Sequence, residues 1–420
     1  MIKNIVLITF LFFSSVYGIS KEEVVKQIQN ILASLPKETT AGIMIYNPLK
    51  QDTIFIKNHQ LSMIPASITK LFTISTSLNI MGGDHKLSTK FFTDDYDLND
   101  GVINGNIYIK GFGNPLFTDS DLNELINTLS QMGIKEISGD IVGDDTFFDN
   151  VYTRDDWIEN ENANVKLPPI SALVLDRNQT TTRRKVRRWY RYVTETIKDP
   201  PLFIANILKE KIVSFGITFN GKSKKGATPD NTKLILEKSI PLNELIAHIN
   251  KHSDNFLAEC LFKTLGAEAS GLQGNSFYSQ LAILKFLKEN NIYSTGTEIV
   301  DGSGISRFDQ VTPAAITGVL EKMYFDLIHF EDFYNSLSIA GVDGTLSRRM
   351  VGTSAENRFR GKTGTLNGVS GIAGYLEGAN GEELVITILI EFKKGSWRYF
   401  RNVQDQIITL LADWKKESSD

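Results

Sequence analysis

The sequence is poor in the residues on which thiol and metal chemistry depend. Its 420 residues include one cysteine, Cys260, and five histidines. A lone cysteine cannot form an internal disulfide, and its apolar neighbours favour a buried structural thiol over a nucleophile. The histidines lack metal-ligand spacing, so we expect no metal and no cofactor. No Gly-x-Ser-x-Gly turn is present, which disfavours a Ser-His-Asp hydrolase.

Strong net charge and long apolar runs are also missing. The net charge of −4 argues against nucleic acid as the main partner. Residues 1–18 resemble a secretory signal peptide, with Lys3, an apolar core from Ile5 to Phe13 and a small residue at Gly18. The alternative is a membrane anchor, but this run is too short to span a bilayer. We therefore predict a periplasmic protein with no later membrane span.

The first candidate catalytic motif is Ser67-Ile-Thr-Lys70. A helix is predicted after it from the spacing of Leu71, Ile74, Leu78 and Met81, ending at Gly82-Gly83. Ser67 and Lys70 would then share one face near a helix N-terminus, where free N–H groups favour an oxyanion. The alternative is a capping serine beside a solvated lysine. Ser34-Leu-Pro-Lys37 has the same spacing, but its proline is typical of an element boundary.

Two further motifs follow, Ser253-Asp254-Asn255 and Lys362-Thr363-Gly364-Thr365. The first lies between two helical stretches and could be an ordinary helix cap. The second precedes apolar strands and could be a hairpin turn. All three motifs in this order are typical of penicillin-binding proteins and class A β-lactamases, and they indicate acyl transfer through a serine ester.

Each motif residue has a predicted role in that reaction. Ser67 is the candidate nucleophile, and Lys70 is its base if burial and the charge of Lys362 lower the pKa of Lys70. Ser253 is the candidate proton relay to the leaving amine, and Asn255 would bind the substrate peptide bond. The residues expected to hold a terminal carboxylate are Lys362, Thr363, Gly364 and Thr365.

The chain also resembles the serine D-alanyl-D-alanine carboxypeptidase/endopeptidase family, the class C low-molecular-mass penicillin-binding proteins. The resemblance rests on the three motifs, Asp301-Gly-Ser-Gly-Ile-Ser-Arg307, Gly341-Val-Asp-Gly-Thr-Leu346 and the extension of the third motif to Ser370. It implies an oxyanion hole from the N–H groups of Ser67 and Thr365. It also implies that Arg307 and Asp145 contact the free end of the stem-peptide diamino acid, although Asp145 could equally be a turn residue.

The family implies an α+β fold with an antiparallel sheet, helices on both faces, and the motifs along a groove beside one edge strand. The long interval between Lys70 and Ser253 predicts an inserted β-rich domain at residues 87–236. The catalytic domain would consist of residues 19–86 and 237–420.

A basic cluster at Arg183–Arg191 has six cationic side chains in nine residues. It could bind an anionic polymer or a membrane surface. We favour a solvated strand or loop, with Val186, Trp189 and Tyr192 as core contacts.

These observations predict a periplasmic serine D-alanyl-D-alanine carboxypeptidase that acts on peptidoglycan stem peptides and is inhibited by β-lactams. Endopeptidase activity and peripheral membrane or cell-wall association are open. The alternatives are a serine β-lactamase and a catalytically silent peptidoglycan-binding relative.

Overall fold

The computed structural model describes residues 19–97, 100–157, 167–186, 188–379 and 381–415. The signal peptide predicted at 1–18 lies outside the described residues. Within the described ranges, no helix combines the length and the hydrophobicity that crossing a membrane requires.

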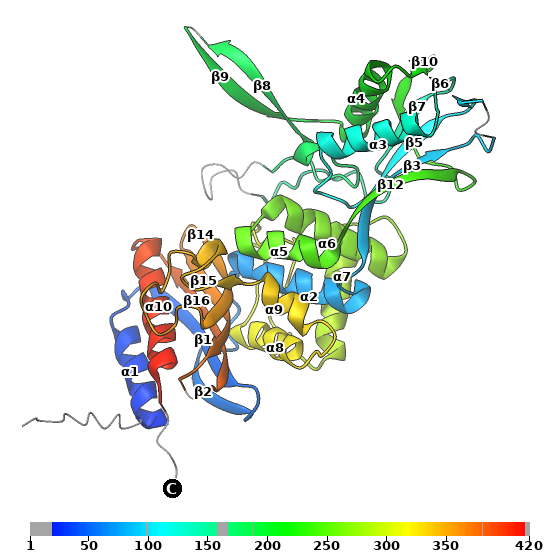
Figure 1. The fold of residues 1–420 in the computed structure, drawn as a ribbon. Helices are drawn as coiled ribbons and strands as arrows, with labels where there is room; N and C mark the ends of the chain where they lie inside the picture. Colours follow the sequence, from blue (N-terminus) through cyan, green and yellow to red (C-terminus); the bar gives the residue numbers. More distant parts are fainter. Residues whose placement is uncertain (1–18, 98–99, 158–166, 187, 380, 416–420) are drawn as a thin grey trace, which may run out of the picture.

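A six-stranded antiparallel sheet forms the centre of the molecule (Figure 1). Its strands, in spatial order, are β13 (Ser338–Ile339), β14 (Phe359–Leu366), β15 (Val369–Glu377), β16 (Glu383–Phe392), β1 (Thr39–Asn47) and β2 (Asp52–Lys57). The apolar run in β16 is buried throughout because both faces of the sheet are covered. Successive side chains point to opposite faces, so Leu389 packs into one core and Ile390 into the other.

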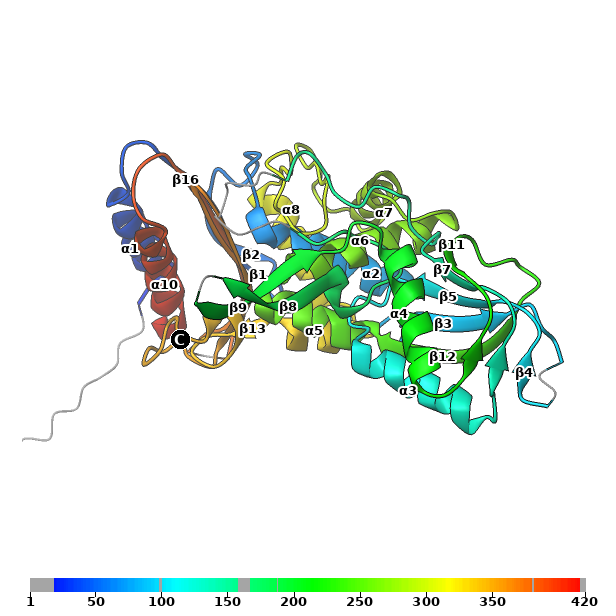
Figure 2. The same cartoon turned by 90° about the horizontal axis from the view of Figure 1, so that it is seen from above.

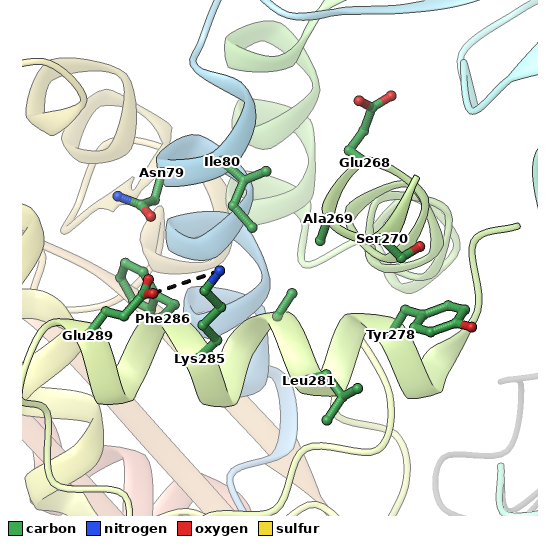
Figure 3. Close-up of a pocket in the computed structure, with 11 residues that line it drawn as sticks. Asn79, Ile80, Glu268, Ala269, Ser270, Tyr278, Leu281, Lys285, Phe286 and Glu289 are labelled. Atoms are coloured by element: carbon green, nitrogen blue, oxygen red, sulfur yellow. Dashed lines mark ion pairs between the residues drawn. The ribbon is translucent and has the colours of Figure 1, made fainter. Parts of the chain in front are cut away.

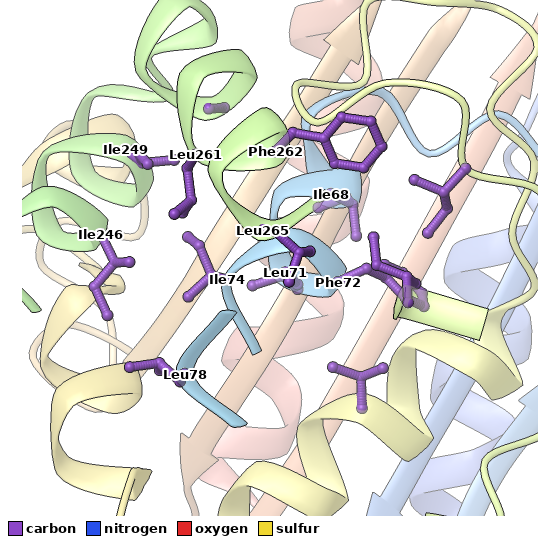
Figure 4. Close-up of a cluster of buried hydrophobic side chains, with 14 of the residues drawn as sticks. Ile68, Leu71, Phe72, Ile74, Leu78, Ile246, Ile249, Leu261, Phe262 and Leu265 are labelled. Atoms are coloured by element: carbon purple, nitrogen blue, oxygen red, sulfur yellow. The ribbon is translucent and has the colours of Figure 1, made fainter. Parts of the chain in front are cut away.

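Helices cover the two faces of this sheet. The first and last helices, α1 (Lys21–Ala33) and α10 (Trp397–Asp413), pack on one side (Figure 2). The other core contains α2 (Thr69–Met81) and its neighbours (Figure 4). Those neighbours are α5 (Leu242–His252), α6 (Asn255–Ser270), α7 (Ser276–Glu289), α8 (Pro313–Tyr324) and α9 (Phe330–Ser336). This layering agrees with the predicted fold class.

A second layered unit lies between α2 and α5 in the sequence. Its main sheet has the order β11 (Ser223–Lys225), β7 (Ile141–Asp144), β5 (Ile107–Phe112), β3 (Lys86–Thr93) and β12 (Lys233–Pro241). A smaller parallel sheet contains β10 (Thr218–Phe219), β6 (Glu136–Ile137) and β4 (Val102–Ile103). Helices α3 (Asp119–Gln131) and α4 (Pro200–Ser214) pack into a separate hydrophobic core within this unit.

We refer to this unit as the insert. Strands β3 and β12 pair from Lys86↔Pro241 to Thr93↔Lys233, so the chain enters and leaves the insert side by side. The pairing extends past the predicted junction at 236/237, and the exact domain limits stay a prediction.

A two-stranded hairpin projects from the insert (Figure 1). It consists of β8 (Gln179–Val186) and β9 (Trp189–Thr196). The expectation of a solvated strand at the basic cluster is confirmed, but the expected core contacts are wrong. Val186, Trp189 and Tyr192 are 43%, 75% and 76% exposed, because no other strand or helix among the described residues covers this ribbon.

Candidate active site

Ser67 lies in a single 3₁₀ turn, Ala66–Ile68, and α2 begins two residues later at Thr69. The predicted helix therefore exists, and its last residue is Met81, followed by Gly82 as the cap. Ala66 has a left-handed backbone with φ of 49°, a conformation that is uncommon outside glycine. Ser67 remains partly exposed, so its hydroxyl can meet a substrate.

Lys70 is fully buried, and its ammonium nitrogen has three hydrogen-bond partners. Its Nζ lies 2.9 Å from Ser67 Oγ, 2.7 Å from Asn255 Oδ1 and 2.5 Å from the Ser303 carbonyl oxygen. The two carbonyl-type oxygens can only accept hydrogen bonds, whereas the serine hydroxyl can also donate one. A neutral Lys70 would donate to both carbonyls and turn its lone pair toward Ser67.

The pKa of Lys70 is lowered to about 8, and burial is the cause. The negative charges of Asp301, Glu259, Asp254 and Asp309 oppose this shift. The predicted effect of burial is confirmed. The charge of Lys362 is not among the causes of the Lys70 shift, so that part of the prediction is not confirmed. Instead, burial and the charge of Lys70 hold the pKa of Lys362 well below its usual range.

A buried carboxyl group, Glu259, binds the backbone segment that contacts Lys70. This residue was not predicted from the sequence. Its Oε1 accepts hydrogen bonds from the backbone N–H groups of Gly302 and Ser303, at 3.1 and 2.8 Å. These bonds fix the backbone that leads to the Ser303 carbonyl, which accepts from Lys70. Glu259 lies one helical turn after Asn255 on α6, and that i, i+4 spacing was the available signal.

The loop that begins at Asp301 folds around that side chain. Asp301 accepts hydrogen bonds from the N–H groups of Ser303, Gly304 and Ser306. A side-chain carbon at Gly304 would lie 1.9 Å from the Ala66 carbonyl oxygen. Glycine is therefore required for this loop to approach the Ser67 turn.

The second lysine forms a separate pair with the second motif. Lys362 Nζ donates to Ser253 Oγ at 2.8 Å and to the Thr363 carbonyl at 2.8 Å. Ser253 ends α5 in a left-handed conformation, φ 53° and ψ 40°. This conformation turns the chain between α5 and α6, and Asn255 begins α6 with its amide directed to Lys70.

The third motif lies on β14. The neighbouring strand β13 is short and pairs with Arg360 and Gly361, which come just before the motif. At Gly364 a side-chain carbon would lie 2.6 Å from the Pro65 carbonyl oxygen, so glycine permits β14 to pack against the Ser67 turn. Arg401 on α10 donates to Thr365 Oγ1 at 3.0 Å. Arg401 was not predicted, and it adds positive charge next to the proposed carboxylate site.

The insert contacts the second motif through Arg177. Its guanidinium binds both carboxylate oxygens of Asp254, at 2.8 and 3.0 Å, and lies over the Phe256 ring at 4.8 Å. Arg177 belongs to three consecutive residues with left-handed φ, at positions 176–178. Such backbone is unfavourable, and the buried Asn178 stabilises it by donating to the Pro169 carbonyl.

The two residues predicted from resemblance alone have different surroundings. Asp145 Oδ2 accepts hydrogen bonds from Tyr152 and Ser171, at 2.7 and 2.9 Å, all within the insert. Arg307 donates to the Asn367 carbonyl at 2.6 Å, at the turn between β14 and β15. Their roles in substrate binding stay predictions.

A cavity of about 410 Å³ lies away from these motifs (Figure 3). It is formed by the ends of α2 and α6 and one face of α7, and its lining includes Ile80, Glu268, Tyr278, Leu281 and Lys285. No motif residue lines it, so it is separate from the serine–lysine site.

The sequence matches the D-Ala-D-Ala carboxypeptidase 3 (S13) family over residues 24–189 and 189–414. The chain belongs to this family. It is a serine-type D-alanyl-D-alanine carboxypeptidase by membership, as the motifs and the resemblance predicted.

Individual relatives agree with this assignment. The chain is 26% identical to a D-alanyl-D-alanine carboxypeptidase of Actinomadura sp. (strain R39), over 89% of this chain and 81% of the relative. It is 24% identical to D-alanyl-D-alanine carboxypeptidase DacB of Haemophilus influenzae, over 86% and 88% of the two chains. The crystal structure of penicillin binding protein 4 from Haemophilus influenzae superposes with a TM-score of 0.80 at 22% identity, covering 91% and 99%.

Proposed function

We propose that this carboxypeptidase removes the terminal D-alanine of peptidoglycan stem peptides through a Ser67 acyl-enzyme. The observation that carries the proposal is the position of Lys70. It is buried, has a pKa lowered to about 8, and lies 2.9 Å from Ser67 Oγ with carbonyl oxygens as its other partners. Proton removal from a serine by such a positioned base typically accelerates the reaction by about 10²–10⁴.

The reaction would proceed in two steps. Ser67 Oγ attacks the carbonyl carbon of the penultimate residue while its proton moves to Lys70. Ser253, hydrogen-bonded to Lys362, relays the proton taken up by Lys70 to the nitrogen of the departing D-alanine as the carbon–nitrogen bond breaks, so Lys70 is neutral again. Water then attacks the ester carbonyl, Ser67 regains its proton, and the shortened peptide leaves.

β-Lactams would acylate the same serine, and their opened ring has no separate leaving group. Penicillin binding protein 4 of Haemophilus influenzae has been crystallised with a β-lactam, which supports this proposal. We also propose endopeptidase action on cross-linked peptides and a periplasmic location, both on the strength of the family resemblance and the N-terminal sequence.

The test compares two reagents on the purified mature chain. We expect release of D-alanine from a peptide ending in D-Ala-D-Ala, and a penicillin adduct that persists after the free reagent is removed. Rapid release of hydrolysed penicillin without D-alanine would instead establish a β-lactamase. If neither an adduct nor free D-alanine forms, the protein is the catalytically silent relative.

A further inference from the structure

The hairpin β8–β9 forms an exposed surface that the acyl-transfer site does not use. Its strands pair from Gln179↔Thr196 to Val186↔Trp189, and within the described part of the chain they form a sheet of two strands. In Figure 1 the hairpin extends from the insert away from the body of the molecule. Its distal half carries the basic cluster, apart from residue 187, which lies outside the described residues.

Polarity changes along the length of the hairpin. The half next to the insert is rich in threonine, at 180–182, 194 and 196. The distal half contains five described cations and three exposed aromatic rings: Arg183, Arg184, Lys185, Arg188, Arg191, Trp189, Tyr190 and Tyr192. The positive charge is local, because the whole chain has a net charge of −4.

The strand register sorts these side chains onto two faces, since directly opposite residues share a face. One face carries the cross-strand pairs Lys185↔Tyr190 and Arg183↔Tyr192, and the Arg183 guanidinium lies over the Tyr190 ring at 4.3 Å. The other face carries Arg184↔Arg191 and, next to the tip, Val186↔Trp189.

Two features of this arrangement are unfavourable for the hairpin alone. Arg184 and Arg191 are like charges directly opposite each other, which destabilises a strand pair, and the ion pair of Arg184 with Glu195 at 2.7 Å offsets only one of the two charges. Trp189 is 75% exposed at the end of a ribbon that has no core of its own. An environment that is anionic at its surface and less polar beneath it would relieve both.

We propose that the hairpin binds an anionic phospholipid surface, with its tip in the headgroup region. Tryptophan and tyrosine rings favour the boundary between water and acyl chains. Lysine and arginine next to them are attracted to acidic headgroups. A soluble polyanion would account for the cations but leave the exposed Val186↔Trp189 pair without a role, which favours the lipid surface.

The proposal is independent of the acyl-transfer site, so its test keeps acylation as a check of folding. The purified mature chain is floated with vesicles of phosphatidylcholine alone or with added phosphatidylglycerol. We expect flotation only with the acidic lipid, and less flotation as salt is raised.

Paired variants separate the two contributions. Trp189→Ser and the double change Arg184→Gln/Arg191→Gln should each lower partitioning about tenfold or more. Leu327→Ser, which is 97% exposed elsewhere, and Lys26→Gln/Lys233→Gln, which remove two other exposed charges, should bind as the wild type does. All four should still be labelled by penicillin.

Three outcomes would overturn the proposal. The wild type could fail to float with phosphatidylglycerol vesicles. The control variants could lose as much binding as the hairpin variants, which would indicate a non-specific charge effect. Trp189→Ser could bind dextran sulfate and acidic vesicles as tightly as the wild type does, which would assign the hairpin to an anionic polymer.

Discussion

The reactivity of Ser67 depends on whether Lys70 is neutral. With a pKa near 10.5 only about 0.03% of a lysine is neutral at pH 7, whereas a pKa of about 8 gives about 10%. Burial is therefore the main physical device that makes Lys70 available as a base. Substrate binding would shift the balance further, because a carboxylate beside Lys362 favours the protonated form of Lys362 over that of Lys70.

This pKa predicts the pH dependence of acylation. The neutral base is lost as pH falls, so the second-order rate constant for penicillin should drop about tenfold per pH unit below pH 8 and level off above it. Stopped-flow labelling from pH 6 to 10 measures this profile. A rate that rises with the same slope to pH 10 would mean that Lys70 keeps an ordinary pKa.

Lys362 allows a second test at one side chain. Lys362→Ala should slow acylation at least about a hundredfold, because it removes the positive charge proposed to face the substrate carboxylate. In the wild type, a peptide with an amidated C-terminus should be cleaved more slowly than the free acid. Equal rates on the two peptides would show that Lys362, Thr363 and Thr365 do not bind that carboxylate.

Contacts between elements place these side chains. The Ser67 turn is approached by β14 through Gly364 and by the Asp301 loop through Gly304. The α5–α6 turn is held by Arg177 from the insert. The insert thus contributes to the position of Ser253 and Asn255 without containing a motif residue.

Arg177→Lys should test that contribution. A lysine cannot make the two-pronged contact with Asp254, so we expect acylation about tenfold slower with little change in melting temperature. Lys224→Ala, at an exposed ion pair elsewhere in the insert, is the matched control. If Arg177→Lys is acylated as fast as the wild type, the Arg177–Asp254 pair does not help to position the second motif.

The elements were more predictable than their contacts. Helical spacing after Ser67 indicated α2, and the structure has this helix at Thr69–Met81 with Gly82 as its cap. Periodicity could not indicate that Glu259 would lie under the Asp301 loop, because that contact joins segments far apart in sequence. The exposure of Trp189 was missed for a related reason, since only the tertiary structure shows that the described residues leave β9 exposed.

The whole molecule combines an acyl-transfer unit with an insert. We predict that the insert binds the part of the stem peptide that lies away from the cleaved bond. Besides Arg177, the insert reaches the catalytic elements through Trp157, which donates to Asp301, and Asp149, which pairs with Lys263. Asp145 lies in the same part of the insert, and its two described side-chain hydrogen bonds end on Oδ2. We predict that Oδ1 accepts from the ammonium group of the diamino acid.

Asp145→Asn should therefore separate two substrates. A charged hydrogen bond of about 1.5–3 kcal/mol predicts a ten- to hundredfold loss of turnover on stem peptides with a free diamino-acid end. Acylation by a simple penicillin, which has no such group, should hardly change. Equal losses with both reagents would make Asp145 a structural residue of the Tyr152–Ser171 cluster.

The central claim is that Ser67 carries the acyl group, and peptide mapping after penicillin treatment tests it most directly. Mass spectrometry of the digested adduct should place one penicilloyl group on the peptide that contains Ser67, and Ser67→Ala should abolish both the adduct and D-alanine release. An adduct on the peptide that contains Ser34, or an adduct that survives Ser67→Ala, would contradict the account.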